Sequence, residues 1–320
     1  MTTFDVPNQK NMNLNHSGKL AEAIYQLSQY DLLKGLCHEQ QESSLMLSTA
    51  VLEEIVNLSR SVLFPGYFGD ATINKQNLSS HIGKDIERLF QLLKLQILSG
   101  LCFDKNRESN AAAECAATDK KAEQQVLEDR AENIVTDFIA ELPNLRAILA
   151  TDVEASYNGD PAAQSLDEVI YCYPGIRAIS SYRIAHKLLE LGVPMIPRII
   201  TEMAHSETGI DIHPGASVGA YFAIDHGTGV VIGATAIIGN NVKLYQGVTL
   251  GAKSFPLDEM GHPIKGIPRH PILKDNVIVY SNATILGRIT VGENATVGGN
   301  IWVTEDVAPN ARILQSKAKK

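Results

Sequence analysis

The sequence predicts an α+β fold in which a helical N-terminal domain precedes a parallel β-helix. Between residues 17 and 206, apolar residues recur at three- and four-residue steps, which is the period of one face of a helix. After Gly209, aliphatic residues recur every six positions, a period that neither a helix nor a plain strand keeps on one face. This change of period divides the 320 residues into two domains of ordinary size.

The helical part, residues 17–206, contains several helical segments and one break. Residues 104–125 are polar and rich in alanine, with few bulky apolar residues, which indicates a linker or an exposed insertion. Pro174 and Pro194 lie near the starts of two segments, where proline is tolerated. The apolar pattern predicts helices over residues 48–63, 79–98, 128–142, 143–155, 166–171, 175–191 and 194–206.

Residues 207–308 follow a hexapeptide repeat, and residues 309–320 form a C-terminal tail. A repeat of this length is typical of a parallel β-helix, whose coils stack their aliphatic side chains inward. The residues expected inside are Ile212, Val218, Ile224, Ile232, Ile238, Leu244, Leu250, Leu273, Val279, Ile285, Val291, Val297 and Val303, with Ala216, Ala236, Val242, Val248, Ala283 and Ala295 two positions before six of them.

The repeat is interrupted twice, and each interruption is a candidate place for a site. Residues 226–231 shift the repeat by two positions, and residues 251–272 must leave the stack as a protruding loop. Segments projected from a rigid scaffold are where sites tend to lie. Asp211 precedes His226 by fifteen residues, and a coil of three hexapeptides has about eighteen, so we expect the two side chains on neighbouring coils.

Composition and charge exclude several classes of protein. With 44% hydrophobic and 20% charged residues the chain is globular, and no stretch approaches the ~20 apolar residues of a membrane span. Residues 1–16 are a polar tail without the apolar core of a signal peptide, and the four cysteines show no CxxC spacing, so we expect a reduced, cytoplasmic protein. The net charge of −8 argues against nucleic acid as a partner.

Six short motifs are specific through their order and spacing. They are GDPAA (159–163), YRIAHKL (182–188), GIDIHPGASVG (209–219), DHGTGVVIG (225–233), QGVTLG (246–251) and RHP (269–271). With them the chain resembles, over residues 155–305, the serine O-acetyltransferase family of hexapeptide-repeat acyltransferases. The resemblance implies a left-handed β-helix and transfer of acetyl from acetyl-CoA to the hydroxyl of L-serine, the first step of cysteine biosynthesis.

The expected chemistry needs a general base. A serine hydroxyl attacks a thioester only if its proton is removed as the bond forms, and histidine is suited to this. A carboxylate on the other ring nitrogen fixes the tautomer and stabilises the imidazolium. The resemblance assigns these roles to His226 as base and Asp211 as its partner.

The amino-acid substrate needs one cationic and one anionic contact. Arg269 offers a planar fork that suits a carboxylate, with His270 beside it, and Asp160 offers a charge for the ammonium group. By resemblance these residues, with Pro161 and Asp225, bind serine. The structural alternatives are a basic loop for Arg269, a helix N-cap for Asp160 and a turn aspartate for Asp225.

The resemblance places coenzyme A in the groove beside the β-helix, near Gly251, Ala252, Ser281 and Gly299, with no metal. The oxyanion donors are expected among backbone N–H groups near Gly227–Gly229, without a specific assignment.

The resemblance also implies partners. L-Cysteine is expected as a feedback inhibitor, because it differs from serine by one atom. We expect a homotrimer rather than a hexamer, since the helical part is longer than usual for the family. The last residue, Lys320, stands where members that dock into O-acetylserine sulfhydrylase have isoleucine, so that docking is not expected.

Three other functions fit parts of the pattern. A γ-class carbonic anhydrase is also a β-helix, and it needs three histidines on zinc, for which His213, His226, His262 and His270 are candidates. An acetyltransferase for sugars would not need Asp160 and Arg269. A non-catalytic scaffold gives no reason for Asp211 and His226.

Overall fold

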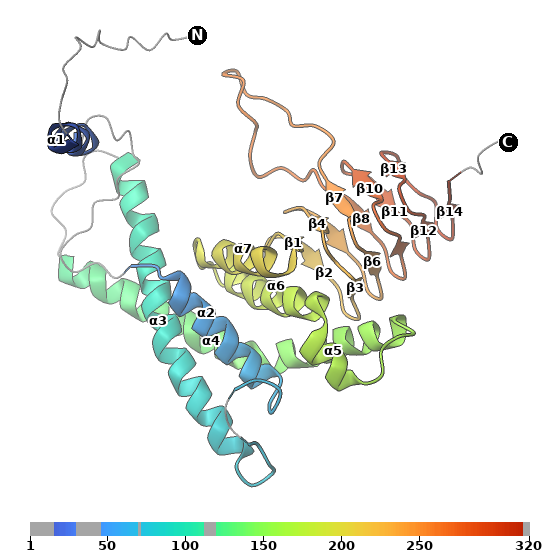
Figure 1. Cartoon of the computed structure of the whole chain (residues 1–320), viewed down its shortest axis with the longest axis horizontal. Helices are drawn as coiled ribbons and strands as arrows, with labels where there is room; N and C mark the ends of the chain where they lie inside the picture. The colour runs from blue at the N-terminus through green and yellow to red at the C-terminus, as the bar shows by residue number, and fades with distance from the viewer. Residues whose placement is uncertain (1–15, 30–45, 70–71, 112–119, 316–320) are drawn as a thin grey trace. The chain divides into compact units, whose positions relative to one another are not determined.

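The computed structural model describes residues 16–29, 46–69, 72–111 and 120–315. The chain divides into two units, residues 1–44 and 45–320, and helix α1 (His16–Leu27) belongs to the first. All other helices and strands in the described ranges belong to the second unit (Figure 1). Of the two predicted tails, residues 1–15 and 316–320 lie outside the described residues.

Three long helices form the first layer of the second unit. They are α2 (Thr49–Leu63), α3 (Leu78–Ala111) and α4 (Lys120–Gly159), and α2 packs on α3 while α3 packs on α4. The side chain of Ser48 caps α2 by accepting a hydrogen bond from the backbone N–H of Val51. The apolar faces form a common core that includes Leu52, Leu93 and Phe138. No helix in the described ranges is long and apolar enough to cross a membrane.

Two features of these helices differ from the sequence prediction. Residues 104–111 and 120–125, predicted as part of a linker or an exposed insertion, continue α3 and begin α4, and residues 112–119 lie outside the described residues. Alanine, glutamate, lysine and glutamine, which are common in this segment, favour the helical conformation. A scarcity of bulky apolar residues is therefore compatible with a helix that has no buried face, and it does not by itself predict that the helix ends. Helix α4 also runs through Pro143, where two helices are predicted, because Leu142 and Leu145 on either side are buried in the core.

Three shorter helices connect the first layer to the β-helix. They are α5 (Leu166–Cys172), α6 (Pro174–Glu190) and α7 (Ile196–Thr208), and α6 packs closely on α7. Arg183 on α6 donates to both carboxylate oxygens of Asp152 on α4, at 2.6 and 2.9 Å, and to the carbonyl of Gly219 at 2.8 Å. Asp152 also accepts the backbone N–H of Phe222 at 2.9 Å. This buried pair therefore fixes α4 and α6 on the first coil.

Residues 211–313 form a left-handed parallel β-helix, as predicted. Its three sheets have the orders β1-β4-β7-β10-β13, β2-β5-β8-β11 and β3-β6-β9-β12-β14. The strands are β1 (Asp211–Ile212), β2 (Ser217–Val218), β3 (Ala223–Asp225), β4 (Val231–Ile232), β5 (Ile237–Ile238), β6 (Lys243–Tyr245), β7 (Thr249–Gly251), β8 (Ile272–Leu273), β9 (Ile278–Val279), β10 (Thr284–Leu286), β11 (Thr290–Val291), β12 (Thr296–Val297), β13 (Trp302–Val303) and β14 (Arg312–Ile313).

The interior of the β-helix consists of the residues that the repeat predicts. All thirteen aliphatic residues in register are buried, at most 9% exposed, and so are the six residues two positions before them. The stack continues past residue 308, because β14 pairs with β12. Thr296 pairs with Arg312, only sixteen residues later, whereas a coil of three hexapeptides has about eighteen. The last coil therefore does not keep the six-residue repeat, which is why the repeat predicted an end at residue 308.

The two interruptions of the repeat change the spacing of stacked residues. Ile212 stacks on Ile232, twenty residues later, whereas Ile232 stacks on Leu250 after eighteen. Leu250 stacks on Ile285, thirty-five residues later, because the chain between β7 and β8 leaves the stack. Figure 1 shows this loop projecting away from the strands.

An asparagine ladder, which the repeat alone does not predict, follows one corner of the β-helix. Asn241, Asn276, Asn294 and Asn310 all have left-handed backbone conformations, with φ between 54° and 61°. Asparagine tolerates this conformation better than other residues with a Cβ. Each side-chain amide donates to the next along the ladder, at 2.7, 3.0 and 3.1 Å. The ladder thus joins four successive coils at their turns.

Candidate active site

The carboxylate of Asp160 lies directly after the end of α4. Its Oδ1 accepts the backbone N–H of Ala162 at 2.8 Å, and its Oδ2 accepts the hydroxyl of Tyr173 at 2.6 Å. The pKa of Asp160 is lowered, chiefly by the hydrogen bond from Tyr173, and further by the one from Ala162 and by the positive charge of Lys243. Ser165, not Asp160, caps α5. Asp160 is therefore an ionised carboxylate at the start of a turn.

Lys243 connects the end of α4 to Asp225 on β3. Its Nζ lies 2.9 Å from Asp225 Oδ2 and donates to the carbonyl of Gly159 at 2.6 Å. Burial disfavours the charged form of Lys243, but hydrogen bonding to Tyr245 and Asp225 outweighs burial and raises its pKa. Lys243 is thus a fixed cation that holds Asp225 in place.

His226 occupies the corner after β3. Its backbone is left-handed, with φ of 57°, which is uncommon for a residue with a Cβ, and its side chain is 71% exposed. The following Gly227 is also left-handed, and a Cβ there would lie 2.4 Å from Ile210 Cδ1, so the turn requires glycine. His226 Nδ1 lies 3.7 Å from Asp225 Oδ1. The tight corner therefore presents the imidazole to solvent beside Asp225.

We use the name Asp160 group for Asp160, Tyr173, Asp225, His226 and Lys243. All of them except His226 line a small hollow. Its volume is about 10 Å³, with Ser156, Ala223 and Ile224 completing the lining. One water needs about 10–15 Å³ of such space. The Asp160 group of one chain is therefore too open and too shallow to enclose an amino acid.

His270 belongs to a second group of residues and lies at the end of the protruding loop, just before β8. Its ring is 7% exposed, and Nδ1 accepts the backbone N–H of Thr235 at 3.1 Å. A Cβ on Gly233 would lie 2.0 Å from the ring, so this glycine makes the space for it. Burial, followed by repulsion from Arg269, lowers the pKa of His270 to about 4. His270 is therefore neutral, with its proton on Nε2.

Arg269 has an unsatisfied donor. Its backbone N–H donates to the hydroxyl oxygen of Thr235 at 2.9 Å, and its guanidinium carbon lies 5.7 Å from the centre of the Phe255 ring in the protruding loop. Its Nε is buried and has no hydrogen-bond partner among the residues that the structure describes. Buried donors almost always have an acceptor, so this one is suited to an anionic ligand.

His213 interacts electrostatically with Arg269 and His270 and also with Asp211, and we call these four residues the Arg269 group (Asp211, His213, Arg269 and His270). His213 is half-buried, and its Nδ1 accepts the backbone N–H of Gly215 at 2.9 Å. Burial, followed by repulsion from Arg198, lowers the pKa of His213. His213 is thus a neutral residue of the group rather than a solvated surface histidine.

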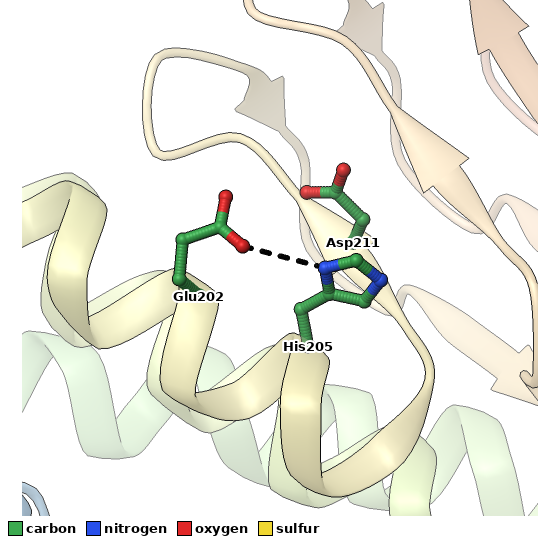
Figure 2. A group of neighbouring side chains, drawn as sticks. All are labelled: Glu202, His205 and Asp211. Carbon is green, nitrogen blue, oxygen red and sulfur yellow. Dashed lines mark hydrogen bonds and ion pairs between the residues drawn. The ribbon is translucent and has the colours of Figure 1, made fainter. Parts of the chain in front are cut away.

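Figure 2 shows Asp211 together with Glu202 and His205 of α7, whose ligand atoms lie within 4.8 Å of one another. Arg198 forms ion pairs with Glu202 and, at 3.9 Å, with Asp211. The two carboxylates therefore already have a cation. Among the described residues of one chain this is the only cluster with metal-ligand spacing, and it contains one histidine, so the three-histidine zinc site of a carbonic anhydrase has no counterpart there.

The predicted couple of Asp211 and His226 is not formed within one chain. No hydrogen bond or ion pair between described residues joins them, and they belong to different groups. The two extra residues at the corner shift the stacking, so Asp211 lies against Val231 on the next coil. His226 follows β3, the last strand of the first coil, so it lies on the same coil as Asp211 and not on the neighbouring coil.

The residues predicted to contact coenzyme A flank one sheet. Gly251 ends β7 and stacks on Leu286 of β10, with Ala252 following it. Ser281 and Gly299 stack on successive coils at the opposite end of these strands, where a Cβ on Gly299 would lie 3.0 Å from the Ser281 carbonyl. Pro161, predicted to contact serine, is exposed in the turn after Asp160. Gly251, Ala252, Ser281 and Gly299 are all partly exposed.

Comparison with known proteins identifies the family. No protein-family model matches the chain. A plasmid-encoded serine acetyltransferase of Synechococcus elongatus is 47% identical over 260 residues, which cover 81% of this chain and 79% of that protein. The structure of serine acetyltransferase isoform 3 from Entamoeba histolytica in complex with cysteine has a TM-score of 0.67 and 31% identity, covering 94% of this chain and 91% of that one.

Soybean serine acetyltransferase complexed with serine has a TM-score of 0.51 and 27% identity, covering 86% of this chain and 98% of that one. Both structures thus extend over the helical layer as well as the β-helix. With nearly half of the residues identical over four fifths of its length to the Synechococcus protein, the chain belongs to the serine acetyltransferase family.

Proposed function

We propose that the protein transfers the acetyl group of acetyl-CoA to the hydroxyl of L-serine, giving O-acetyl-L-serine and CoA. Family membership supports this, and the soybean relative binds serine. The observation in this chain that carries the proposal is the buried Nε of Arg269, a donor without an acceptor beside the neutral His270. A planar carboxylate, such as that of serine, supplies the missing acceptor.

The ammonium group of serine is recognised by Asp160. Asp225 already has Lys243 as its cation, at 2.9 Å, whereas the hydrogen bonds to Asp160 come from the neutral Tyr173 and a backbone N–H. A carboxylate has about four lone-pair sites, so Asp160 keeps room for an ammonium group. The opposite charges of Asp160 and Arg269 therefore distinguish an amino acid from a sugar.

His226 is the general base. It takes the proton of the serine hydroxyl as the serine oxygen bonds to the thioester carbon, and the resulting imidazolium protonates the sulfur of CoA as the carbon–sulfur bond breaks. A positioned base of this kind contributes about 10²–10⁴-fold. The exposure of its ring at the corner supports this role, because both substrates must reach it.

The complete site takes its two groups from adjacent copies of the chain. The small hollow in the Asp160 group and the separation of Asp211 from His226 support this, because each group lacks what the other contains. The Asp160 group of one copy then faces the Arg269 group of the next, with Asp211 orienting His226 across the interface. An interface between two different surfaces closes only into a ring of three or more copies, and we infer the smallest such ring, a homotrimer.

Acetyl-CoA lies along the sheet flanked by Gly251, Ala252, Ser281 and Gly299. These residues are small and partly exposed, so the pantetheine arm can approach their main chain closely. The thioester must reach His226, whose corner is continuous with the first coil of the same β-helix. No metal takes part in the proposed chemistry.

L-Cysteine is proposed as a competitive inhibitor. It offers the same ammonium and carboxylate to Asp160 and Arg269, and the Entamoeba relative was solved in complex with cysteine. A competitive pattern against L-serine in initial rates is the expected result. Unchanged rates with millimolar cysteine at low serine would reject this part.

The test of the function is release of the CoA thiol from acetyl-CoA with different acceptors. We expect L-serine to give the highest kcat/KM, with D-serine, L-homoserine and a simple galactoside at least about tenfold lower. D-Serine misplaces a charged group relative to the hydroxyl, L-homoserine misplaces the hydroxyl, and the galactoside lacks both charged groups. A protein prepared in the same way with His226→Ala is the control for contaminating activity. Equal rates with the galactoside would overturn the assignment to an amino acid.

A further inference from the structure

An open cavity of about 930 Å³ lies in the helical layer, away from both groups of the candidate active site. Its walls come from α2, from residues 67–69 just after it, and from the first turns of α3, where His81, Lys84 and Asp85 line it. It shares no lining residue with the Asp160 group or the Arg269 group. Whatever this cavity holds therefore does not belong to the serine site.

Arg60 on α2 is the unusual residue of this cavity. It is only 8% exposed, and its Nε is buried with no hydrogen-bond partner. No described residue forms a hydrogen bond or an ion pair with its guanidinium group. Arginine is seldom buried without an anionic or carbonyl partner, because the charge loses its hydration. The protein thus retains a buried cation that its own described residues leave unpaired.

The surroundings of Arg60 keep it charged and oriented. Its guanidinium carbon lies 4.0 Å from the centre of the Phe68 ring, which covers one face of the plane. Burial and, second, repulsion from Arg177 lower the pKa of Arg60 to about 10, against the attraction of Glu207. At neutral pH it still carries its proton. The donors at the edge of the plane are the part of Arg60 left for a ligand.

The carboxylates that line the same cavity do not neutralise Arg60. Glu54 pairs with Arg88 at 2.9 Å, and Asp85 accepts the hydroxyl of Ser61 at 2.8 Å. Glu53 lies on the exposed side of α2. The cation needs an anion, and the cavity has far more volume than a single water or chloride ion occupies.

We propose that this cavity binds a small organic oxyanion, a metabolite with a carboxylate or phosphate group that Arg60 holds through its planar donors. Carboxylate and phosphate are the groups that the guanidinium fork recognises with two parallel hydrogen bonds. Tyr67, Phe68 and Leu58 provide apolar surface for the body of the ligand. The site is a second ligand site, separate from the serine and acetyl-CoA sites.

The first experiment titrates the purified full-length protein with inorganic phosphate and with succinate, each against sodium chloride of matched ionic strength. Thermal unfolding is the readout. We expect a saturable rise in Tm with at least one of the two anions. In Arg60→Met the affinity should fall about tenfold or more, because the only fork in the cavity is gone. Arg60→Lys should fall nearly as far, because it keeps the charge and loses the fork.

The matched control is Arg130→Met, which removes one exposed arginine of the same helical layer that does not line the cavity. This variant should keep the full response. An equal response in Arg130→Met and the Arg60 variants, or no response beyond that to sodium chloride, would overturn the proposal.

A second measurement does not depend on the folding of any variant. In the wild-type protein, the effective anion should slow hydrogen–deuterium exchange in residues 57–69 and 81–85. Slowing confined to residues 209–299 would place the anion at the acetyl-CoA site and contradict the proposal. If Arg60→Lys changed the mass of the oligomer, and no anion protected residues 57–69 from exchange, the proposal would be contradicted. Arg60 would then form a contact between copies of the chain rather than bind an anion.

Discussion

Two ion pairs lie where the helical layer meets the β-helix, and they differ in how completely the protein satisfies them. Asp152 is wholly buried and accepts hydrogen bonds from Arg183, at 2.6 and 2.9 Å, and from the backbone of Phe222. Asp225 is 14% exposed and has one close contact with Lys243, at 2.9 Å. We call the Asp152–Arg183 pair closed, because protein groups surround it completely. We call the Asp225–Lys243 pair open, because Asp225 is partly exposed on the side of His226.

The difference shows how one kind of contact serves two purposes. Around Asp152 and Arg183 every strong donor and acceptor meets a protein partner, so the pair can only hold α4 and α6 against the first coil. Around Asp225 and Asp160 the carboxylates keep lone pairs facing a hollow too small to be a complete site. We infer that the closed pair supports the fold and the open pair supports catalysis.

The largest expected effect comes from breaking the closed pair. Asp152→Ala leaves Arg183 buried without its partner, and the expected loss in the free energy of unfolding is about 3–5 kcal/mol. Urea unfolding followed by circular dichroism measures it. The matched control is Glu54→Ala, which breaks the exposed pair with Arg88 and should cost at most about 1 kcal/mol. A loss of similar size in both variants would remove the distinction between closed and open pairs.

The next effect concerns the base beside the open pair. His226→Ala should lower kcat by about 10²-fold or more, because the missing base acts in the transition state, while acetyl-CoA still binds. Its free energy of unfolding should stay close to wild type, since the ring is largely exposed. Asp211→Asn should lower kcat less, in the same direction. Near-normal turnover in His226→Ala would contradict the mechanism.

A smaller effect is expected for the carboxylate contact. Arg269→Ala should weaken serine binding by about 1.5–3 kcal/mol, seen as a higher KM for serine. The KM for acetyl-CoA should stay nearly constant. The opposite pattern, with weaker acetyl-CoA binding and unchanged serine kinetics, would make Arg269 a phosphate contact instead.

The smallest effect is expected from Lys243, which positions Asp225 and the end of α4. Lys243→Met removes the contacts with Asp225 and the Gly159 carbonyl but keeps the length of the side chain. We expect a rise of a few-fold in the KM for serine, about 1 kcal/mol, and a smaller change in unfolding free energy than in Asp152→Ala. Lys274→Met, at an exposed position on the same β-helix, is the control. Equal kinetics in the two variants would deny Lys243 a role in the site.

The sequence predicts the β-helix almost residue by residue, because each coil repeats one packing problem and an inward position every six residues admits only apolar side chains. The helical layer is less predictable at its boundaries. Whether α4 continues through Pro143 depends on the burial of Leu142 and Leu145 by other helices, which local sequence does not contain.

The candidate site is predictable in its residues but not in its arrangement. The motifs indicate Asp160, Asp225, His226, Arg269 and His270, whose chemistry suits an amino acid. The division into two groups depends on the two extra residues at the corner, and thus on the stacking of whole coils. The partners Lys243, Tyr173 and Thr235 carry no signal in the sequence, because they are defined only by contacts between distant segments.

Each complete site is proposed to join the Asp160 group of one copy to the Arg269 group of the next. Co-expression of His226→Ala and Arg269→Ala chains with different tags, followed by purification of mixed oligomers, tests this most directly. Purified mixed trimers should restore about one third of the wild-type kcat/KM for L-serine, because any ring of three that contains both chains has one site in which each neighbour supplies its unaltered group. Activity no higher than that of the two single variants, in oligomers shown to contain both chains, would contradict the shared site.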